Sequence, residues 1–189
     1  MRVIAGSAKG ILLKKPTSFL RPTMDRVRAA IFSILGERVP YASVLDLCSG
    51  TGAMGIEALS RGAADATLVD NNTRSIEAIK NNLTTTRLKA QVEHMDSLAY
   101  LKRISGAFVF DLIFADPPYA DDQGNNLAAS LLESPFLIGA MAPEALFILE
   151  CEHKQSLPGI CGLEILIDRT YGATRILIMK KNEGVTSKK

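Results

Sequence analysis

The sequence predicts an α/β fold in which a doubly wound, mostly parallel sheet is covered by helices. From Ser43 onward, short apolar runs of strand length alternate with stretches whose apolar residues recur at helical spacing. Such alternation is typical of parallel sheets joined by right-handed crossovers. The last two apolar runs have no helix between them, which indicates an antiparallel hairpin. The length of 189 residues fits one such domain.

The first forty residues precede this alternation and form a predicted extension. Thr23 is a suitable N-cap for a helix, and Gly36 and Pro40 stop that helix. Ahead of it we expect a small β-hairpin, with strands at residues 3–5 and 11–13 and a turn at residues 6–10.

The main sheet then follows in order. Expected strands contain residues 44–45, 66–69, 92, 112–115 and 146–149, and expected helices lie near 53–61, 73–88, 97–104 and 124–139. The closing hairpin pairs residues 163–167 with 175–179 and turns at 171–173. These seven strands define a main domain, residues 41–181, between the extension, residues 1–40, and a polar tail, residues 182–189, that we expect to be disordered.

The composition indicates a globular protein without a structural metal. The cysteines Cys48, Cys151 and Cys161 lack a C-x-x-C spacing, which argues against a disulfide framework and a zinc site. They fit a reducing, cytoplasmic setting. We expect no membrane contact, because no apolar run reaches the ~18 residues of a membrane span and no signal peptide is evident.

Positive charge is concentrated in residues 1–28, the basic arm. The arm carries seven basic side chains and one acid, a balance of +6, while the rest of the chain carries −4. A basic arm on a mildly acidic body is typical of nucleic-acid binding, although a solvated arm that only aids solubility has the same charge. The candidate RNA contacts are Lys9, Lys14, Lys15, Arg21, Arg26 and Arg28, and the alternative for one of the last two is a position facing the cofactor cleft or the body of the domain.

A glycine loop, residues 48–55, is the first candidate site. It follows a strand and opens a helix, and ligands of open α/β sheets bind at the carboxyl ends of strands. Gly50 and Gly52 allow a tight turn close to a ligand. Asp70, at the end of the next strand, can accept both hydrogen bonds of a ribose diol. The residues expected to bind the cofactor are Asp46, Ser49, Gly50, Thr51, Gly52, Asp70, Asn71, Asp96, Ser97 and Asp116.

Two ligand classes compete for the glycine loop. Its Gly-x-Gly-x-x-Gly spacing also fits a dinucleotide, whose pyrophosphate would lie on the helix N-terminus. Asp46 directs a negative charge to the same place, which suits the sulfonium and amino-acid group of S-adenosyl-L-methionine better. A strand–helix turn without any ligand is the structural alternative. Asp96 follows the third strand, near the expected adenine, and a helix N-cap explains it equally well.

The segment Asp116-Pro117-Pro118-Tyr119 indicates the chemistry. It follows an apolar strand, and its prolines stiffen the loop and remove backbone donors. The Pro117 carbonyl and the Asp116 carboxylate then offer two fixed acceptors for the two hydrogens of an exocyclic amine. Tyr119 offers a flat face for a base, with stacking worth roughly 1–3 kcal/mol. A plain Pro-Pro turn is the alternative.

Together these segments resemble the bacterial 16S ribosomal RNA guanine-N2 methyltransferases of the RsmD-like family. The resemblance covers nearly the whole chain, and the stretch Leu-Arg-Pro-Thr-Met-Asp-Arg-Val-Arg at residues 20–28 is the most family-specific. The other shared segments are residues 2–6, 9–10, 46–59, 116–119 and 171–175.

The resemblance implies a class I S-adenosyl-L-methionine-dependent methyltransferase fold, Rossmann-like, with an N-terminal hairpin and helix. It implies S-adenosyl-L-homocysteine as the second product and the N2 amine of a specific guanine as the target. The expected partner is 16S rRNA, within the small ribosomal subunit or an assembly intermediate, and the protein is expected to be a monomer. By resemblance, Asp46, Gly50, Gly52, Asp70 and Asp96 line the cofactor pocket, and residues 116–119 hold the guanine.

Three other functions share part of this pattern. A DNA adenine-N6 or cytosine-N4 amino-methyltransferase has both motifs but usually carries a separate recognition domain. A protein glutamine N5-methyltransferase presents an amide to the same two acceptors, but favours Asn in place of Asp116 and leaves the basic arm unexplained. A binding module that has lost catalysis is disfavoured because Asp116 and Tyr119 are intact.

Overall fold

The computed structural model describes residues 1–15, 24–118, 126–158, 160 and 162–182. The chain divides into two compact units, Met1–Ser97 and Leu98–Lys189. The predictions made for Arg21, Thr23, Tyr119 and Cys161 fall outside the described residues, as does all of the predicted tail except Asn182.

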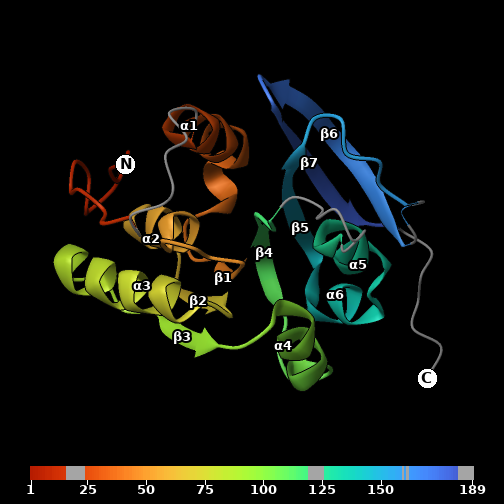
Figure 1. The fold of residues 1–189 in the computed structure, drawn as a ribbon, viewed down its shortest axis with the longest axis horizontal. Coiled ribbons are helices and arrows are strands. Elements are labelled where there is room, and N and C mark those ends of the chain that lie inside the picture. The colour runs from red at the N-terminus through yellow and green to blue at the C-terminus, as the bar shows by residue number, and fades with distance from the viewer. Residues whose placement is uncertain (16–23, 119–125, 159, 161, 183–189) are drawn as a thin grey trace. The chain divides into compact units, whose positions relative to one another are not determined.

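The first unit contains three parallel strands (Figure 1). Strand β2 lies between β1 and β3, pairing Leu45 with Thr67 and Thr67 with Gln91. Helix α2 packs against β1 and β2, and α3 against β2 and β3. The elements are α1 (Met24–Leu35), the short 3-10 helix η1 (Gly36–Arg38), β1 (Ser43–Leu47), α2 (Ala53–Ser60), β2 (Asp65–Asp70), α3 (Thr73–Thr86) and β3 (Gln91–His94). This confirms the predicted alternation of strands and helices.

The second unit contains four strands in the order β4-β5-β7-β6. Strand β5 pairs in parallel with β4 and antiparallel with β7, and β6 pairs antiparallel with β7. The elements are β4 (Phe110–Ala115), α5 (Leu127–Glu133), α6 (Pro135–Ala140), β5 (Met141–Glu152), β6 (Leu163–Tyr171) and β7 (Thr174–Lys181); α4 (Ser97–Ile104) begins where the first unit ends. The closing hairpin is confirmed, with Tyr171 paired to Thr174 across its turn.

The single helix predicted near residues 124–139 is wrong. The structure has two helices there, α5 and α6, separated at Ser134. Ser134 is extended, with φ −76° and ψ 118°, and Pro135 opens α6. A proline disfavours helical backbone in the residue before it, so the chain must leave one helix before it begins the next.

The N-terminal hairpin, residues 1–15, is only partly as predicted. It has an antiparallel bridge between Arg2 and Leu12, and the Val3 amide donates to the Ile11 carbonyl at 3.0 Å. Residues 3–5 and 11–13 nevertheless do not form strands, because the amides of Ile4 and Ala5 donate to the Glu57 carboxylate of α2 and not to a neighbouring strand. Among the described residues, no helix has the length and apolar character to cross a membrane.

Candidate active site

The glycine loop has an unusual backbone. Cys48, Gly50 and Gly52 all have positive φ, at 58°, 55° and 75°. Left-handed backbone is strained for a residue with a side chain, at a cost on the order of 1–3 kcal/mol, and such strain gathers at functional sites. Cys48 is therefore strained, as are Tyr41 and Arg87 outside the loop, and it is the two glycines that make the tight turn at low cost.

The three glycines of the loop serve different purposes. A Cβ added at Gly52 would lie 2.7 Å from the Leu68 side chain, and one at Gly55 would lie 3.1 Å from it. These two glycines let α2 pack closely on β2. Among the residues that the structure describes, nothing lies within 4 Å of a Cβ added at Gly50. Gly50 thus borders open space, where its backbone can approach a ligand.

Asp46 and Ser49 use their side chains within the loop. The Asp46 carboxylate is buried and accepts the Gly55 amide at 2.9 Å, which ties the end of β1 to the first turn of α2. The Ser49 hydroxyl donates to the carbonyls of Asp46 and Val69. Both residues therefore shape the loop. Thr51 is also buried, and its hydroxyl contacts the Met1 sulfur at 3.5 Å.

Asp70 ends β2 beside the glycine loop. One carboxylate oxygen accepts the Gly50 amide and the other accepts the Asn72 amide, both at 2.8 Å. A carboxylate oxygen has two lone pairs, so each oxygen can accept one further hydrogen bond. This fits a ribose diol. Asn71, the next predicted residue, is exposed.

Asp96 and Ser97 lie at the start of α4. Asp96 is exposed, whereas Ser97 is buried and its hydroxyl lies 3.3 Å from the Cys48 sulfur. Through Ser97, the segment that follows β3 comes next to the glycine loop. This is consistent with the prediction that Asp96 and Ser97 line the same pocket as that loop.

Asp116 directly follows β4 in the second unit. Its side chain is half-buried, Pro117 is buried and Pro118 is exposed. The adjacent strand β5 carries Cys151, whose thiol pKa is raised by burial. A protonated thiol is a poor nucleophile. The functional group that the second unit offers at the end of β4 is therefore the Asp116 carboxylate with its proline loop.

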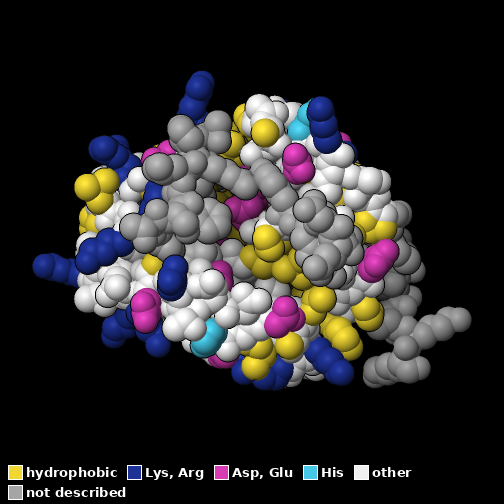
Figure 2. Space-filling view, in the orientation of Figure 1, with side chains coloured by type: hydrophobic (Ala, Val, Ile, Leu, Met, Phe, Trp, Pro, Cys, Tyr) yellow, Lys and Arg dark blue, Asp and Glu magenta, His cyan; other side chains and the backbone are white. Residues whose placement is uncertain are grey.

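Most described cations of the basic arm face solvent. Lys9, Lys14 and Arg26 are exposed and Lys15 is half-buried. Figure 2 shows Lys and Arg side chains gathered on the side of the view where the N-terminus and α3 lie in Figure 1. These side chains are available to an anionic partner.

Arg28 requires a correction. Its side chain is only 3% exposed, it donates to Asp25 at 3.1 Å and to the Arg2 carbonyl, and its Nε lies 3.7 Å from Glu57. Burial lowers the Arg28 pKa, while the Asp25 and Glu57 carboxylates oppose that shift. We therefore remove Arg28 from the predicted RNA contacts, because its guanidinium holds the fold together.

Three buried side chains that sequence reasoning missed anchor the N-terminal hairpin. Glu57 accepts the Ile4 and Ala5 amides, Ser60 accepts the Ala8 amide at 2.9 Å, and Asn82 accepts the Lys14 amide at 2.7 Å. Glu57 had a visible signal, because it is the single charged residue of an otherwise apolar or small α2. Asn82 had no such signal in its polar helix.

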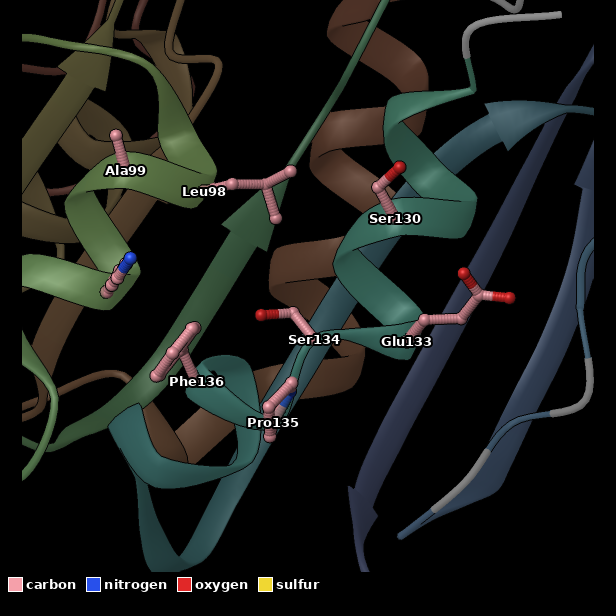
Figure 3. A pocket seen from close by; sticks show the side chains of 8 residues that line it. Leu98, Ala99, Ser130, Glu133, Ser134, Pro135 and Phe136 are labelled. Atoms are coloured by element: carbon pink, nitrogen blue, oxygen red, sulfur yellow. The ribbon is translucent and has the colours of Figure 1, made fainter.

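A separate groove of about 350 Å³ lies in the second unit. Its lining includes Leu98 from α4 and Phe136 from α6, which Figure 3 shows close by. The groove contains none of the predicted site residues, and we give it no part in the chemistry.

Known proteins share this fold over almost the full chain. The yhhF protein of Escherichia coli, a provisionally named methyltransferase, superposes with a TM-score of 0.81 at 30% identity and covers 96% of this chain and 98% of its own. This likeness gives the protein the Rossmann-like α/β fold of class I methyltransferases, in which the glycine loop follows the first strand and Asp70 ends the second.

The family follows from the sequence comparison. The model of the family described as Conserved hypothetical protein 95 matches residues 1–180, and the chain belongs to that family. YlbH of Bacillus subtilis, provisionally named an rRNA methyltransferase, is 36% identical over 96% of this chain and 99% of the relative. Ribosomal RNA small subunit methyltransferase D of Escherichia coli is 36% identical over 85% of this chain and 79% of the relative.

Proposed function

We propose that this protein transfers a methyl group from S-adenosyl-L-methionine to the exocyclic N2 amine of a guanine in small-subunit ribosomal RNA. The observation that carries the proposal is the position of Asp116 and Pro117 directly after β4, in a chain whose glycine loop and Asp70 suit the cofactor. The names of its relatives support an rRNA substrate. The exposed cations of the basic arm support a polyanionic partner.

The chain's own residues fit the cofactor. Within the described part of the chain, Gly50 has open space beside its backbone, and each Asp70 oxygen has a second lone pair with which to accept a ribose hydroxyl. When bound, S-adenosyl-L-methionine supplies an electrophilic methyl group on a sulfonium. Because this methyl group is already a strong electrophile, the protein mainly has to align the target amine with it. Alignment of two reactants can lower the reaction barrier by ~7–11 kcal/mol.

The acceptor loop performs that alignment. The lone pair of a base amine is delocalised into the ring, which makes the nitrogen a poor nucleophile. The Asp116 carboxylate and the Pro117 carbonyl accept the two amine hydrogens, so that the nitrogen can pyramidalise toward the methyl group. The methylated amine would have to lose one proton, and the Asp116 carboxylate is the proton acceptor that this loop would offer.

The test is single-turnover methyl transfer with both substrates saturating. Asp116→Ala should lower the rate by orders of magnitude while the affinity for S-adenosyl-L-homocysteine stays near wild type, since Asp116 acts on the transition state. Asp116→Asn should retain partial activity through its remaining oxygen. Asp111→Ala, an exposed carboxylate at the other end of β4, is the matched control and should behave as wild type. Normal turnover by Asp116→Ala would reduce the loop to a structural turn.

The substrate is tested separately with a tritiated methyl donor and a mixture of total RNA, DNA and protein. We expect label in RNA, and nucleoside digestion should identify N2-methylguanosine. Label in DNA would indicate the adenine or cytosine amino-methyltransferase alternative, and label in protein the glutamine alternative; either result would overturn the proposed substrate.

A further inference from the structure

Asn82 of α3 is fully buried and holds two segments that are distant in sequence. Its carbonyl oxygen accepts the Lys14 amide at 2.7 Å, and its amide nitrogen donates to the Lys14 carbonyl at 3.0 Å. The same nitrogen donates to the Thr51 carbonyl at 2.9 Å. One side chain therefore binds the backbone of the N-terminal hairpin and the backbone of the glycine loop.

Every hydrogen of this amide is used. An asparagine side chain has two N–H donors and one carbonyl acceptor, and here one donor goes to each segment. The Asn82 side chain is 0% exposed, so water cannot readily replace either partner. Displacing Lys14 or Thr51 would leave buried polar groups unpaired.

The two segments have different proposed roles. Thr51 lies between Gly50 and Gly52 in the loop proposed to hold the cofactor. Lys14 presents its side chain to solvent while Asn82 fixes its backbone. A cation proposed to contact RNA and a carbonyl of the cofactor loop thus share one buried anchor.

We infer that Asn82 is a positioning residue that couples the RNA-binding arm to the cofactor loop, an inference that rests on the proposed function. When cofactor binding orders the loop at Thr51, it stabilises the position of Asn82 and with it the hydrogen bonds of Asn82 to Lys14. When RNA binds the arm, the same hydrogen bonds stabilise the loop. Such coupling is reciprocal, so each ligand raises the affinity for the other by the same factor.

The first test needs no RNA and no turnover. Amide hydrogen exchange is measured with and without saturating S-adenosyl-L-homocysteine. The Lys14 amide should exchange about 5-fold more slowly or better when the ligand is bound. The Ala8 amide, held by Ser60 in the same hairpin, is the internal control and should change little. Ligand binding that leaves Lys14 exchange unchanged would overturn the coupling.

Variants extend the test to RNA. Wild type should bind transcribed 16S rRNA about 5-fold more tightly with the ligand than without it. In Asn82→Ala, the ratio of RNA affinities with and without the ligand should fall to near one. Asn82→Asp should do the same, because it keeps the size and the acceptor but loses both donors. Ser60→Ala weakens the same hairpin without touching the loop and should keep the ratio, and exposed Asn81→Ala controls for α3. An undiminished ratio in folded Asn82→Asp would refute the role of Asn82.

Failure of the proposed function and failure of the coupling give different results. Absence of any S-adenosyl-L-homocysteine binding would overturn the proposed function together with the coupling that rests on it. Normal binding of both ligands with independent affinities in wild type would overturn the coupling alone.

Discussion

Replacing Glu57 by alanine should release the N-terminal hairpin from the first unit. Glu57 is 0% exposed, accepts the Ile4 and Ala5 amides at 2.7 and 3.0 Å, and binds Arg61 at 2.7 Å. Its other neighbour, Arg28, is itself buried. Removing one partner of a buried ion pair leaves the remaining charge uncompensated and costs about 3–5 kcal/mol.

The size of the effect follows from that cost. For a domain of this size, 1 kcal/mol lowers the melting temperature by about 2–4 °C, so Glu57→Ala should lower it by roughly 6–20 °C. Calorimetry measures the shift, and amide exchange at Ile4 and Ala5 should accelerate more than exchange in β2. Glu57→Gln keeps one acceptor oxygen, so its melting temperature should lie between those of wild type and Glu57→Ala.

Glu77→Ala is the matched control, because Glu77 is an exposed glutamate on α3. It should change stability by less than about 0.5 kcal/mol. If Glu57→Ala were as harmless as this control, the buried carboxylate would not be what holds the hairpin, and the reasoning from burial and pairing would fail.

Three further predictions concern the ligands. Asp70→Ala should weaken S-adenosyl-L-homocysteine binding by roughly 1.5–3 kcal/mol, measured by titration calorimetry, whereas Asp65→Ala at the other end of β2 should not; unchanged affinity would remove Asp70 from the site. Changing Lys14, Lys15 and Arg21 together to alanine should flatten the log–log salt slope of RNA binding by up to about 2. The same change at the exposed lysines Lys89, Lys102 and Lys154 should not; an unaltered slope in the first variant would make the arm a solvated face. Burial raises the thiol pKa of Cys151, so Cys151 should react with iodoacetamide more slowly than half-buried Cys48 in the glycine loop. Of these two thiols, S-adenosyl-L-homocysteine should protect Cys48 only. Equal protection of both would contradict a ligand at the loop.

Local patterns were sufficient to predict most of the fold. The apolar runs and helical spacings predict all seven strands of the described sheet. This is possible because the burial of a strand and the amphipathicity of a helix depend on residues that are consecutive in the sequence. The missed break between α5 and α6 was also a local signal, since Pro135 follows Ser134 directly. The apolar spacing continues across Ser134 and Pro135, which is why it favours a single helix there.

Long-range pairing could not be predicted in the same way. The hairpin amides were expected to pair across two strands, but Glu57, Ser60 and Asn82 take several of them from helices far along the chain. For the same reason the sequence leaves open whether Arg26 or Arg28 faces the body of the domain, since nothing near Arg28 in the sequence indicates the buried Glu57 beside it.

The anchoring of the N-terminal hairpin also sets an order on folding. Ile4 is 53 residues from Glu57, and Lys14 is 68 residues from Asn82. At about 5–20 residues per second, a ribosome needs roughly 3–14 s to make the second stretch. The hairpin is therefore synthesised well before its anchors exist, and it docks only after α2 and α3 have formed. Contacts of this sequence separation close slowly, which makes hairpin docking a late step in the folding of the first unit.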